Sequence, residues 1–247
     1  MLIKKIPLFK RLYPFILRQI AKIFWRGGYS VVRHQGSLFL LNYRNFIDRE
    51  IAFYNSYEPK QISYFIRLMR ENGCDLFLDI GANFGFYSVK VAQQKIAKEI
   101  VAFEPDFRSI NALKANLLMN DLLDQVQIIP KAVSNKEKKL RFQYFPNTST
   151  GQCRVDEKNG QEFVDAISID RSFQVRDSLI FIKIDVEGHE LEVMEGMSEL
   201  IRLNKVFIQI ECYPDKINAL SKMLGKQNIH QLTNIDNDHY FTNVKST

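Results

Sequence analysis

The sequence predicts an α/β fold in which a doubly wound parallel sheet is covered by helices on both faces. From residue 75 onward, apolar runs alternate with segments of helical periodicity, as in chains of β-α units. The run at residues 76–80 is apolar on both faces apart from Asp79, as expected for a central strand. Gly81 and Gly85 follow at once, and glycines let a ligand approach the N–H groups at a helix start. We therefore expect a doubly wound α/β domain with a cofactor cradle after its first strand.

Length and charge suggest one domain with a basic extension in front of it. The chain has 247 residues, of which 46% are hydrophobic and 25% charged, an ordinary globular composition. Nine of its 34 basic residues lie within the first 44 positions, and no acid precedes Asp48. The remainder carries 25 basic and 28 acidic residues, so the positive net charge of +6 comes from the N-terminal arm.

The cysteine pattern favours a reducing compartment. Cys74, Cys153 and Cys212 are an odd number and contain no C-x-x-C spacing, which argues against a disulfide framework or a zinc site. No apolar run in the N-terminal arm is long enough for a signal peptide or a membrane span. We expect a cytoplasmic protein.

Residues 1–60 form the predicted extension. Pro14 suits the first turn of a helix, after which apolar residues recur at helical spacing, while Arg18, Lys22 and Arg26 form a stripe on another face. Residues 1–26 have two interpretations. In one, the helix lies on an anionic membrane surface at the inner face of the membrane; in the other, it packs on the domain with its basic face in water. The rest of the extension is a hairpin with strands at residues 29–33 and 37–41.

Residues 61–247 form the predicted main domain. A helix at residues 59–71 leads into it and, with the hairpin, is expected to cap the sheet. Residues 133–144 are expected to pair locally. The remaining strands are predicted at 76–79, 100–104, 126–129, 179–184 and 206–210, and the helices at 84–94, 106–119, 189–201 and 214–224.

Acidic residues recur where the predicted strands end. In open α/β sheets, ligands bind beyond the carboxyl ends of the strands, so these acids should lie near the ligand. Glu104, one strand after Asp79, could accept hydrogen bonds from both hydroxyls of a ribose, which NAD and S-adenosylmethionine both contain. The four acids at this edge are Asp79, Glu104, Asp185 and Glu211.

The first turn favours S-adenosylmethionine over NAD. A dinucleotide fingerprint needs three glycines, but the second and third positions here are Asn83 and Phe86. Asn83 would obstruct a pyrophosphate, and Phe86 would push the helix from the strand. Asp79 instead offers a carboxylate for an ammonium group, and the backbone of Gly81 to Gly85 offers donors for a carboxylate, the two ends of a methionine.

Residues 181–190 contain more ionisable groups than a strand-to-helix joint needs. Asp185, at a strand end beside the cradle, is the first candidate for a general base, and His189 is the second. Glu187 is a further catalytic candidate, although Glu187 and Glu190 could equally stabilise a helix start. We expect no bound metal, but Asp185, Glu187, His189 and Glu190 could also gather a divalent cation.

In these stretches the sequence resembles the FkbM family of S-adenosylmethionine-dependent methyltransferases. The resemblance covers about residues 62–214, and the block Lys183-Ile184-Asp185-Val186-Glu187-Gly188-His189-Glu190 is its specific part. The other matching blocks are residues 77–85, 102–105 and 131–134.

The resemblance implies a Rossmann-like domain of the class I methyltransferase type, which transfers a methyl group to a hydroxyl of a sugar or of a polyketide-like product. It implies that Asp79, Gly81, Asn83 and Gly85 hold the methionine part and Glu104 the ribose. Lys131 and Ala132 would lie near the adenine. Asp185 stands where such enzymes place catalytic or substrate-orienting groups.

Two other function classes remain open from the sequence. The first is a non-catalytic, cofactor-binding or membrane-associated assembly protein in which the basic arm matters most. The second is a nucleic-acid methyltransferase, but the body is net negative and lacks a basic stripe interleaved with aromatic residues. We therefore expect a small-molecule or glycan acceptor and no nucleic-acid partner.

Overall fold

The computed structural model describes residues 7–145, 150–213 and 216–245. Its central sheet consists of β3 (Cys74–Ile80), β4 (Ala97–Phe103), β5 (Gln127–Ile129), β10 (Leu179–Ile184), β11 (Lys205–Glu211), β12 (His230–Ile235) and β13 (Asp238–Thr242). The strand order is β12-β13-β11-β10-β3-β4-β5. The pairs from β11 to β5 are parallel, while β13 is antiparallel to both of its neighbours. The predicted doubly wound sheet is confirmed, with an antiparallel hairpin added at one edge.

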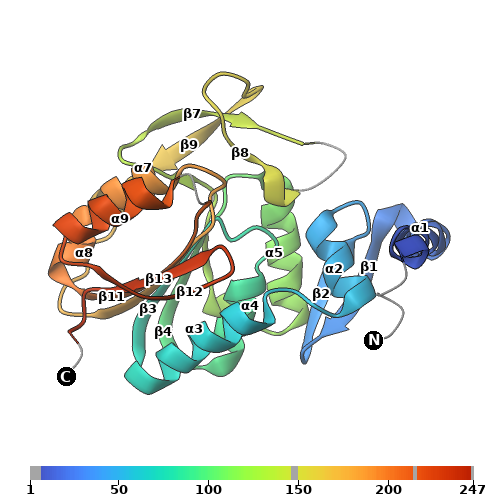
Figure 1. The fold of residues 1–247 in the computed structure, drawn as a ribbon, viewed down its shortest axis with the longest axis horizontal. Coiled ribbons are helices and arrows are strands. Elements are labelled where there is room, and N and C mark those ends of the chain that lie inside the picture. The colour runs from blue at the N-terminus through green and yellow to red at the C-terminus, as the bar shows by residue number, and fades with distance from the viewer. Residues whose placement is uncertain (1–6, 146–149, 214–215, 246–247) are drawn as a thin grey trace.

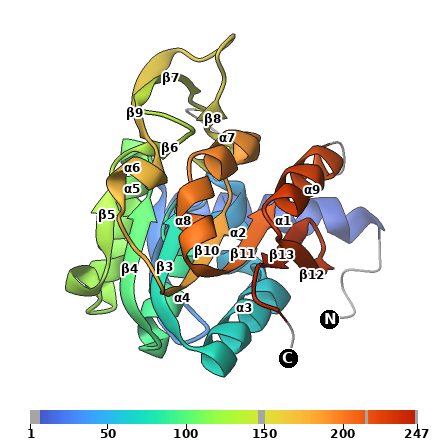
Figure 2. The same cartoon turned by 90° about the vertical axis from the view of Figure 1, so that its left-hand side faces the viewer.

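Helices cover both faces of this sheet (Figures 1 and 2). One apolar cluster joins Phe65, Phe77 and Leu113, and its helices are α3 (Pro59–Asn72), α4 (Phe86–Gln94) and α5 (Phe107–Met119). The cluster on the opposite face includes Leu78, Ile182, Val193 and Leu220. The helices of that face are α6 (Ile169–Ser172), α7 (Glu190–Glu195), α8 (Ser198–Leu203) and α9 (Ile217–Lys226).

The segment between β5 and β10 forms a second, four-stranded sheet. It contains β6 (Ala132–Val133), β7 (Lys138–Gln143), β8 (Arg154–Val155) and β9 (Glu162–Ile167), in the order β6-β9-β7-β8. The short 3-10 helices η3 (Leu123–Gln125) and η4 (Thr150–Gln152) precede and interrupt it. This sheet rises beyond one end of the central strands, at the top of Figure 2. Residues 133–144, which were expected to pair locally, instead pair with β8 and β9, which lie beyond η4 in the chain.

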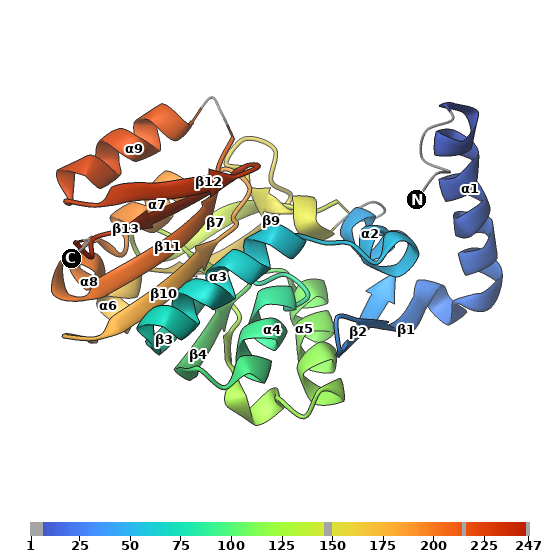
Figure 3. The ribbon, with the colours of Figure 1, turned by 60° about the horizontal axis from the view of Figure 1, so that its bottom comes forward.

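The N-terminal extension packs beside the helical layer rather than over the sheet. It contains α1 (Pro7–Phe24), η2 (Arg26–Gly28), β1 (Tyr29–His34), β2 (Ser37–Asn42) and α2 (Phe46–Tyr54). Although α3 covers the sheet as expected, the hairpin lies against α5. The N–H groups of Leu38 and Leu40 donate to the Oδ1 atoms of Asn120 and Asn116, at 2.9 and 2.7 Å. The helix α1 projects from the far end of this extension (Figure 3).

Several elements differ from the sequence-based expectation. The helix α1 begins at Pro7, so Pro14 lies inside the helix and not in its first turn. The helix expected at residues 189–201 is split into α7 and α8 at Gly196, where a Cβ would lie 2.0 Å from the carbonyl oxygen of Ser134. Helix α2 and the hairpin β12–β13 were not predicted. Within the described residues, none of the helices combines the length and apolarity needed to span a bilayer.

Candidate active site

The turn after β3 is held tightly between two neighbouring strands. The N–H groups of Gly81 and Ala82 both donate to the carbonyl oxygen of Phe103, at 2.9 and 3.0 Å. Gly81 has a φ of 81°, and a Cβ there would lie 1.8 Å from the carbonyl oxygen of Asp185. Glycine is therefore required because the ends of β3 and β10 approach each other closely at this point.

Asn83 connects the turn to three other parts of the chain. Its backbone is left-handed, with a φ of 50°, and its N–H donates to Oε2 of Glu104 at 2.8 Å. Its side-chain Oδ1 accepts from the hydroxyls of Ser109 and Thr150, both at 3.1 Å. Asn83, which breaks the dinucleotide pattern, thus links the turn to Glu104 after β4 and to Thr150 of η4.

Asp79 and Gly85 lie behind the turn rather than in the pocket wall. The Asp79 carboxylate accepts from the N–H and hydroxyl of Ser88, at 3.0 and 2.5 Å, so it fixes the first turn of α4. Burial raises the pKa of Asp79 to about 6. A Cβ on Gly85 would lie 2.2 Å from Cδ1 of Leu113, so this glycine permits the contact between α4 and α5.

Glu104 is buried at the end of β4 and borders the pocket. Oε1 accepts from the N–H of Asp106 at 2.8 Å, and Oε2 from that of Asn83. Burial raises the pKa of Glu104 to about 7, although these two N–H groups oppose the rise. Each carboxylate oxygen has a second lone pair with which it can accept a further donor.

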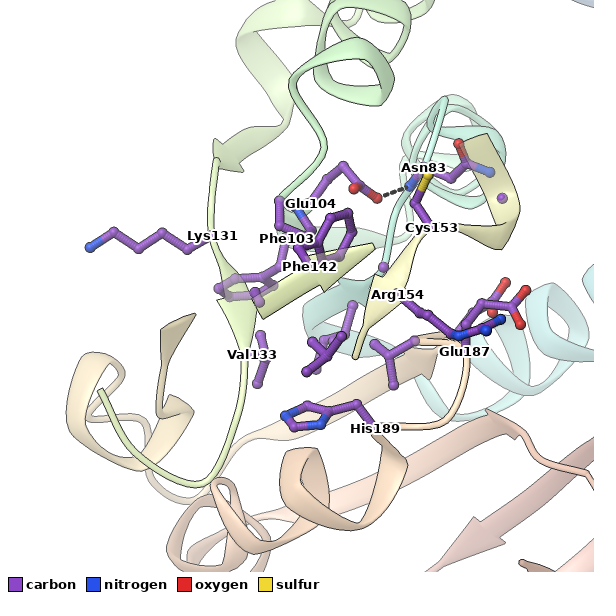
Figure 4. A pocket seen from close by; sticks show the side chains of 18 of the residues that line it. Asn83, Phe103, Glu104, Lys131, Val133, Phe142, Cys153, Arg154, Glu187 and His189 are labelled. Carbon is purple, nitrogen blue, oxygen red and sulfur yellow. Dashed lines mark hydrogen bonds between the residues drawn. The ribbon is translucent and has the colours of Figure 1, made fainter. Parts of the chain in front are cut away.

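A pocket lies beside these residues at the carboxyl edge of the sheet (Figure 4). It encloses about 560 Å³ of empty space, the part open to solvent included. The small sheet and η4 supply one wall through Phe142, Thr150, Cys153 and Arg154. Of the predicted cofactor residues, Gly81, Asn83, Glu104, Lys131 and Ala132 line the pocket, and so do all three catalytic candidates, Asp185, Glu187 and His189.

Asp185 begins the loop after β10. Its N–H donates to the carbonyl oxygen of Ile80 at 2.9 Å, which fixes it beside the glycine turn. Burial raises the pKa of Asp185 well above its ordinary range; the charge of Lys183 opposes this rise, and the nearby Glu211 adds to it. Once it has lost its own proton, a carboxylate with a raised pKa at a pocket wall can accept one from a ligand.

The other ionisable residues of this loop make hydrogen bonds to neighbouring protein groups. His189 is buried with Nε2 2.9 Å from the hydroxyl of Ser134, and burial lowers its pKa. Glu187 has a φ of 52° and accepts a long hydrogen bond from the Tyr213 hydroxyl at 3.5 Å. Glu190 accepts from the N–H of Gly188 at 2.6 Å, so it stabilises the helix start. Among the described residues, no group of three or more His, Cys, Asp or Glu side chains is arranged to hold a metal ion.

Lys183 lies behind Asp185 and not among the residues that line the pocket. Its Nζ donates to Oδ1 of Asp238 at 2.7 Å, and both side chains are buried. Gln209 donates from Nε2 to the same Asp238 oxygen and to the hydroxyl of Tyr87, each at 2.7 Å. The Tyr87 hydroxyl in turn donates to Oε2 of Glu58 at 2.7 Å. This chain, from Lys183 to Glu58, is called the buried polar network below.

Sequence reasoning missed the pocket residues contributed by the small sheet. Phe142, Thr150, Cys153 and Arg154 reach the site only because the segment between β5 and β10 folds back over the sheet edge. Residues 145–155 have no helical or strand periodicity that would have marked them. Glu58 was also missed, although its charge adds to the rise in the pKa of Asp185, because its position depends on how α3 packs.

Comparison with known proteins identifies one family. Residues 79–235 match the family model described as the methyltransferase FkbM domain. The chain is 28% identical over 155 residues to the methyltransferase sdnD of Sordaria araneosa, a match that covers 49% of this chain and 60% of sdnD. It is 27% identical over 184 residues to the hexuronic acid methyltransferase AglP of Haloferax volcanii, covering 71% of this chain and 73% of AglP.

The solved structures include one protein of the same family name. The methyltransferase FkbM of Methylobacillus flagellatus aligns at 15% identity with a TM-score of 0.49, covering 68% of this chain and 43% of that chain. The chain thus spans less than two thirds of the length of sdnD and of this crystallised protein.

Proposed function

Because the chain belongs to the FkbM family of methyltransferases, we propose that it is an S-adenosylmethionine-dependent O-methyltransferase. The acceptor in this proposal is a hydroxyl of a sugar, a polysaccharide or a secondary metabolite. The single observation that carries the proposal is the pocket in which Glu104 and Asp185 flank the glycine turn at the carboxyl edge of the sheet.

The residues of the pocket suit the proposed cofactor. Glu104 keeps lone pairs for two ribose hydroxyls after accepting one N–H on each oxygen. Gly81 leaves no side chain between the turn and a ligand, and Lys131 and Ala132 lie in the part of the wall that we assign to the adenine. Since Asp79 and Gly85 are not among the lining residues, we assign them to supporting the turn.

Asp185 is the proposed general base. Bound S-adenosylmethionine would supply an electrophilic methyl group on a sulfonium, and this chain must hold the acceptor oxygen in line with it. The Asp185 carboxylate removes the hydroxyl proton as the oxygen becomes a nucleophile. His189 is a weaker candidate because Nε2 already contacts Ser134. Glu187, beside Arg154 at the pocket wall in Figure 4, is assigned to orienting the acceptor.

The acceptor class is supported by one relative. AglP is named as a hexuronic acid methyltransferase, and it matches this chain over 71% of its length. Arg154 gives the pocket wall a cation that could pair with an acidic sugar.

The cofactor is tested by thermal shift with S-adenosylhomocysteine and with NAD. We expect stabilisation by S-adenosylhomocysteine alone, since only a ligand that binds the folded state raises the melting temperature. Stabilisation by NAD alone, or by neither compound, would contradict the proposal.

The base is tested with Asp185→Asn and methyl transfer to a panel of sugar acceptors that includes hexuronic acids. We expect turnover to fall by roughly 10²- to 10⁴-fold while S-adenosylhomocysteine still binds, because the amide cannot take the proton. Turnover of the wild type should rise with pH as Asp185 loses its proton, since its pKa is raised. The exposed Asp165→Asn on β9 is the matched control. Full turnover by Asp185→Asn would exclude this residue as the base.

A further inference from the structure

Near its C-terminal end, the helix α1 is held to the body by Ala21 and by the neighbouring Trp25. Ala21 is 1% exposed, and Trp25, just beyond the helix, packs with ring centroids 6.2 Å from Tyr43 and 6.1 Å from Phe53. Figures 1 and 3 show α1 at the margin of the molecule, separated from the central sheet by the hairpin and α2. The C-terminal part of the helix is thus anchored on one side.

Several apolar side chains of α1 are exposed. They are Phe15 at 58%, Ile16 at 44%, Ile20 at 46%, Ile23 at 77% and Phe24 at 75%. Ile16, Ile20 and Ile23 have the i, i+4, i+7 spacing that places side chains on one face of a helix. Single exposed apolar residues are ordinary, but several on one helix face indicate a surface that is covered in use.

Basic residues accompany this apolar face. Arg18 and Lys22, both exposed, stand one turn apart on α1. Arg18 lies near Arg49 of α2. Burial lowers the pKa of Arg49, and the positive charge of Arg18 lowers it further. No acidic residue occurs before Asp48, so no negative charge on the helix offsets these cations.

We propose that α1 is a docking helix for an anionic phospholipid bilayer. Ile16, Ile20 and Ile23 enter the boundary between headgroups and acyl chains, while Arg18 and Lys22 contact lipid phosphates. The helix lies in the plane of the membrane surface, because it is not apolar enough to cross a bilayer. Charge complementarity selects this partner. An anionic bilayer satisfies both the apolar face and the cations, whereas a nucleic acid would leave the apolar face in water.

The test is flotation of the full-length protein with vesicles of phosphatidylcholine alone or mixed with phosphatidylglycerol. We expect binding to the anionic vesicles that weakens with added salt, because the surface charges are screened. Arg18→Gln with Lys22→Gln should weaken binding by roughly fivefold for each charge removed. Ile20→Asn with Ile23→Asn should weaken it by more than about tenfold, because both side chains leave the hydrocarbon boundary.

Matched controls separate α1 from the rest of the surface. Leu118→Asn with Phe163→Asn removes two exposed apolar side chains from the body, and Lys60→Gln with Lys114→Gln removes two exposed cations. Both controls should bind vesicles like the wild type. All variants should melt at the wild-type temperature, since the changed side chains are exposed.

Three outcomes would overturn the proposal. One is equal binding to both vesicle types, or to neither. Another is an equal loss of binding in the control variants. The third is a concentration-dependent dimer that the Ile20→Asn, Ile23→Asn variant abolishes, which would assign the apolar face to a second copy of the chain. None of these outcomes depends on methyl transfer, so the test is independent of the proposed activity.

Discussion

At the scale of single residues, Gly81 serves the packing of the protein as much as the access of a ligand. Its positive φ and its closeness to the Asp185 carbonyl both exclude a side chain. The sequence pattern identified the residue and the turn, but it could not reveal that the constraint comes from the neighbouring strand.

Replacing Gly81 with Ala is expected to lower the melting temperature and weaken S-adenosylhomocysteine binding. The left-handed backbone costs an L-residue about 1–2 kcal/mol, and the contact of the Cβ with Asp185 displaces the turn as well. Differential scanning fluorimetry with and without the ligand measures both effects. Gly225→Ala, inside α9 with no atom within 4 Å of the new Cβ, is the control and should be neutral or stabilising. If Gly81→Ala kept the melting temperature and the ligand affinity of the wild type, the prediction would be wrong, because the turn would have accommodated the added methyl group.

Glu104 is expected to link cofactor binding to proton release. Its pKa is raised from 4.5 to about 7 in the folded protein, so the native state holds a proton that the unfolded state loses near 4.5. The contribution of Glu104 to stability therefore decreases as the pH rises from about 4.5 to 7. Ribose hydroxyls that donate to the carboxylate lower its pKa, so affinity for S-adenosylhomocysteine should increase over the same interval.

Calorimetry at about pH 6 in two buffers of different ionisation enthalpy measures this linkage. Wild-type protein should release protons on binding, and Glu104→Gln should release none from this site. Proton uptake by the wild type, or the same release by Glu104→Gln, would contradict the assignment of Glu104 to the ribose.

At the scale of elements, the buried apolar strands were predictable and the polar edge was not. The strand β10 agrees residue for residue with the predicted 179–184, because it is apolar on both faces. The strand β12 is largely exposed and polar, so it lacks the pattern that marks a buried strand. Phe86, which occupies the third glycine position, lies in the start of α4 and packs against Phe39 of the hairpin at 5.8 Å. That contact between elements could not be inferred from spacing alone.

The buried polar network joins β13, the strand next to the sheet edge, to β11 and β10. Burial alone would lower the pKa of Lys183, but the charges of Asp238 and Glu58 hold it well above its ordinary value. Lys183→Met should reduce the free energy of unfolding by about 3–5 kcal/mol, because it leaves the Asp238 carboxylate buried without its cation. Urea unfolding measures the loss.

The matched control for Lys183→Met is Arg202→Met. Arg202 pairs with Glu199 on the surface, where the two side chains are 65% and 50% exposed, so its loss should cost less than about 1 kcal/mol. Equal costs for the two variants would mean that Lys183 contributes no more than a surface pair.

At the scale of the whole molecule, the extension is attached in two different ways. Phe39, Leu41 and Ile51 belong to the same apolar cluster as Phe84 and Leu117 of the main domain. Among the described side chains of the helix α1 and its junction, the contacts with the body are those of Ala21 and Trp25. The predicted division at residue 60 stays a prediction, but the hairpin and the domain share one core.

Two truncations distinguish these attachments. Removal of residues 1–24 should leave the melting temperature and S-adenosylhomocysteine binding nearly unchanged, because little buried surface is lost. Removal of residues 1–60 should cost about 5 kcal/mol or more, since three fully buried side chains leave the core. Circular dichroism during heating measures both. A stable, ligand-binding protein lacking residues 1–60 would show that the main domain folds alone.

The part of the candidate site that lies at the strand ends was predictable from the alternation of strands and helices. The strand ends at Gly81, Glu104 and Asp185 meet at one pocket because parallel strands bring their carboxyl ends to one edge. The wall that contains Thr150 and Arg154 was not predictable, because the topology of the small sheet brings it there from an irregular segment. The side chain of Asp79 points toward Ser88 and not into the pocket. Its direction depends on the pleat of β3 and on the hydrogen bond from Ser88, and residue spacing in the sequence specifies neither.

The anchor of α1 has an optical consequence. Trp25 is the single tryptophan of the chain, and it lies where the helix joins the body, against Tyr43 and Phe53. All indole fluorescence of the protein therefore originates at this joint. A change in its emission wavelength or quenching reports on the joint alone, without any attached dye.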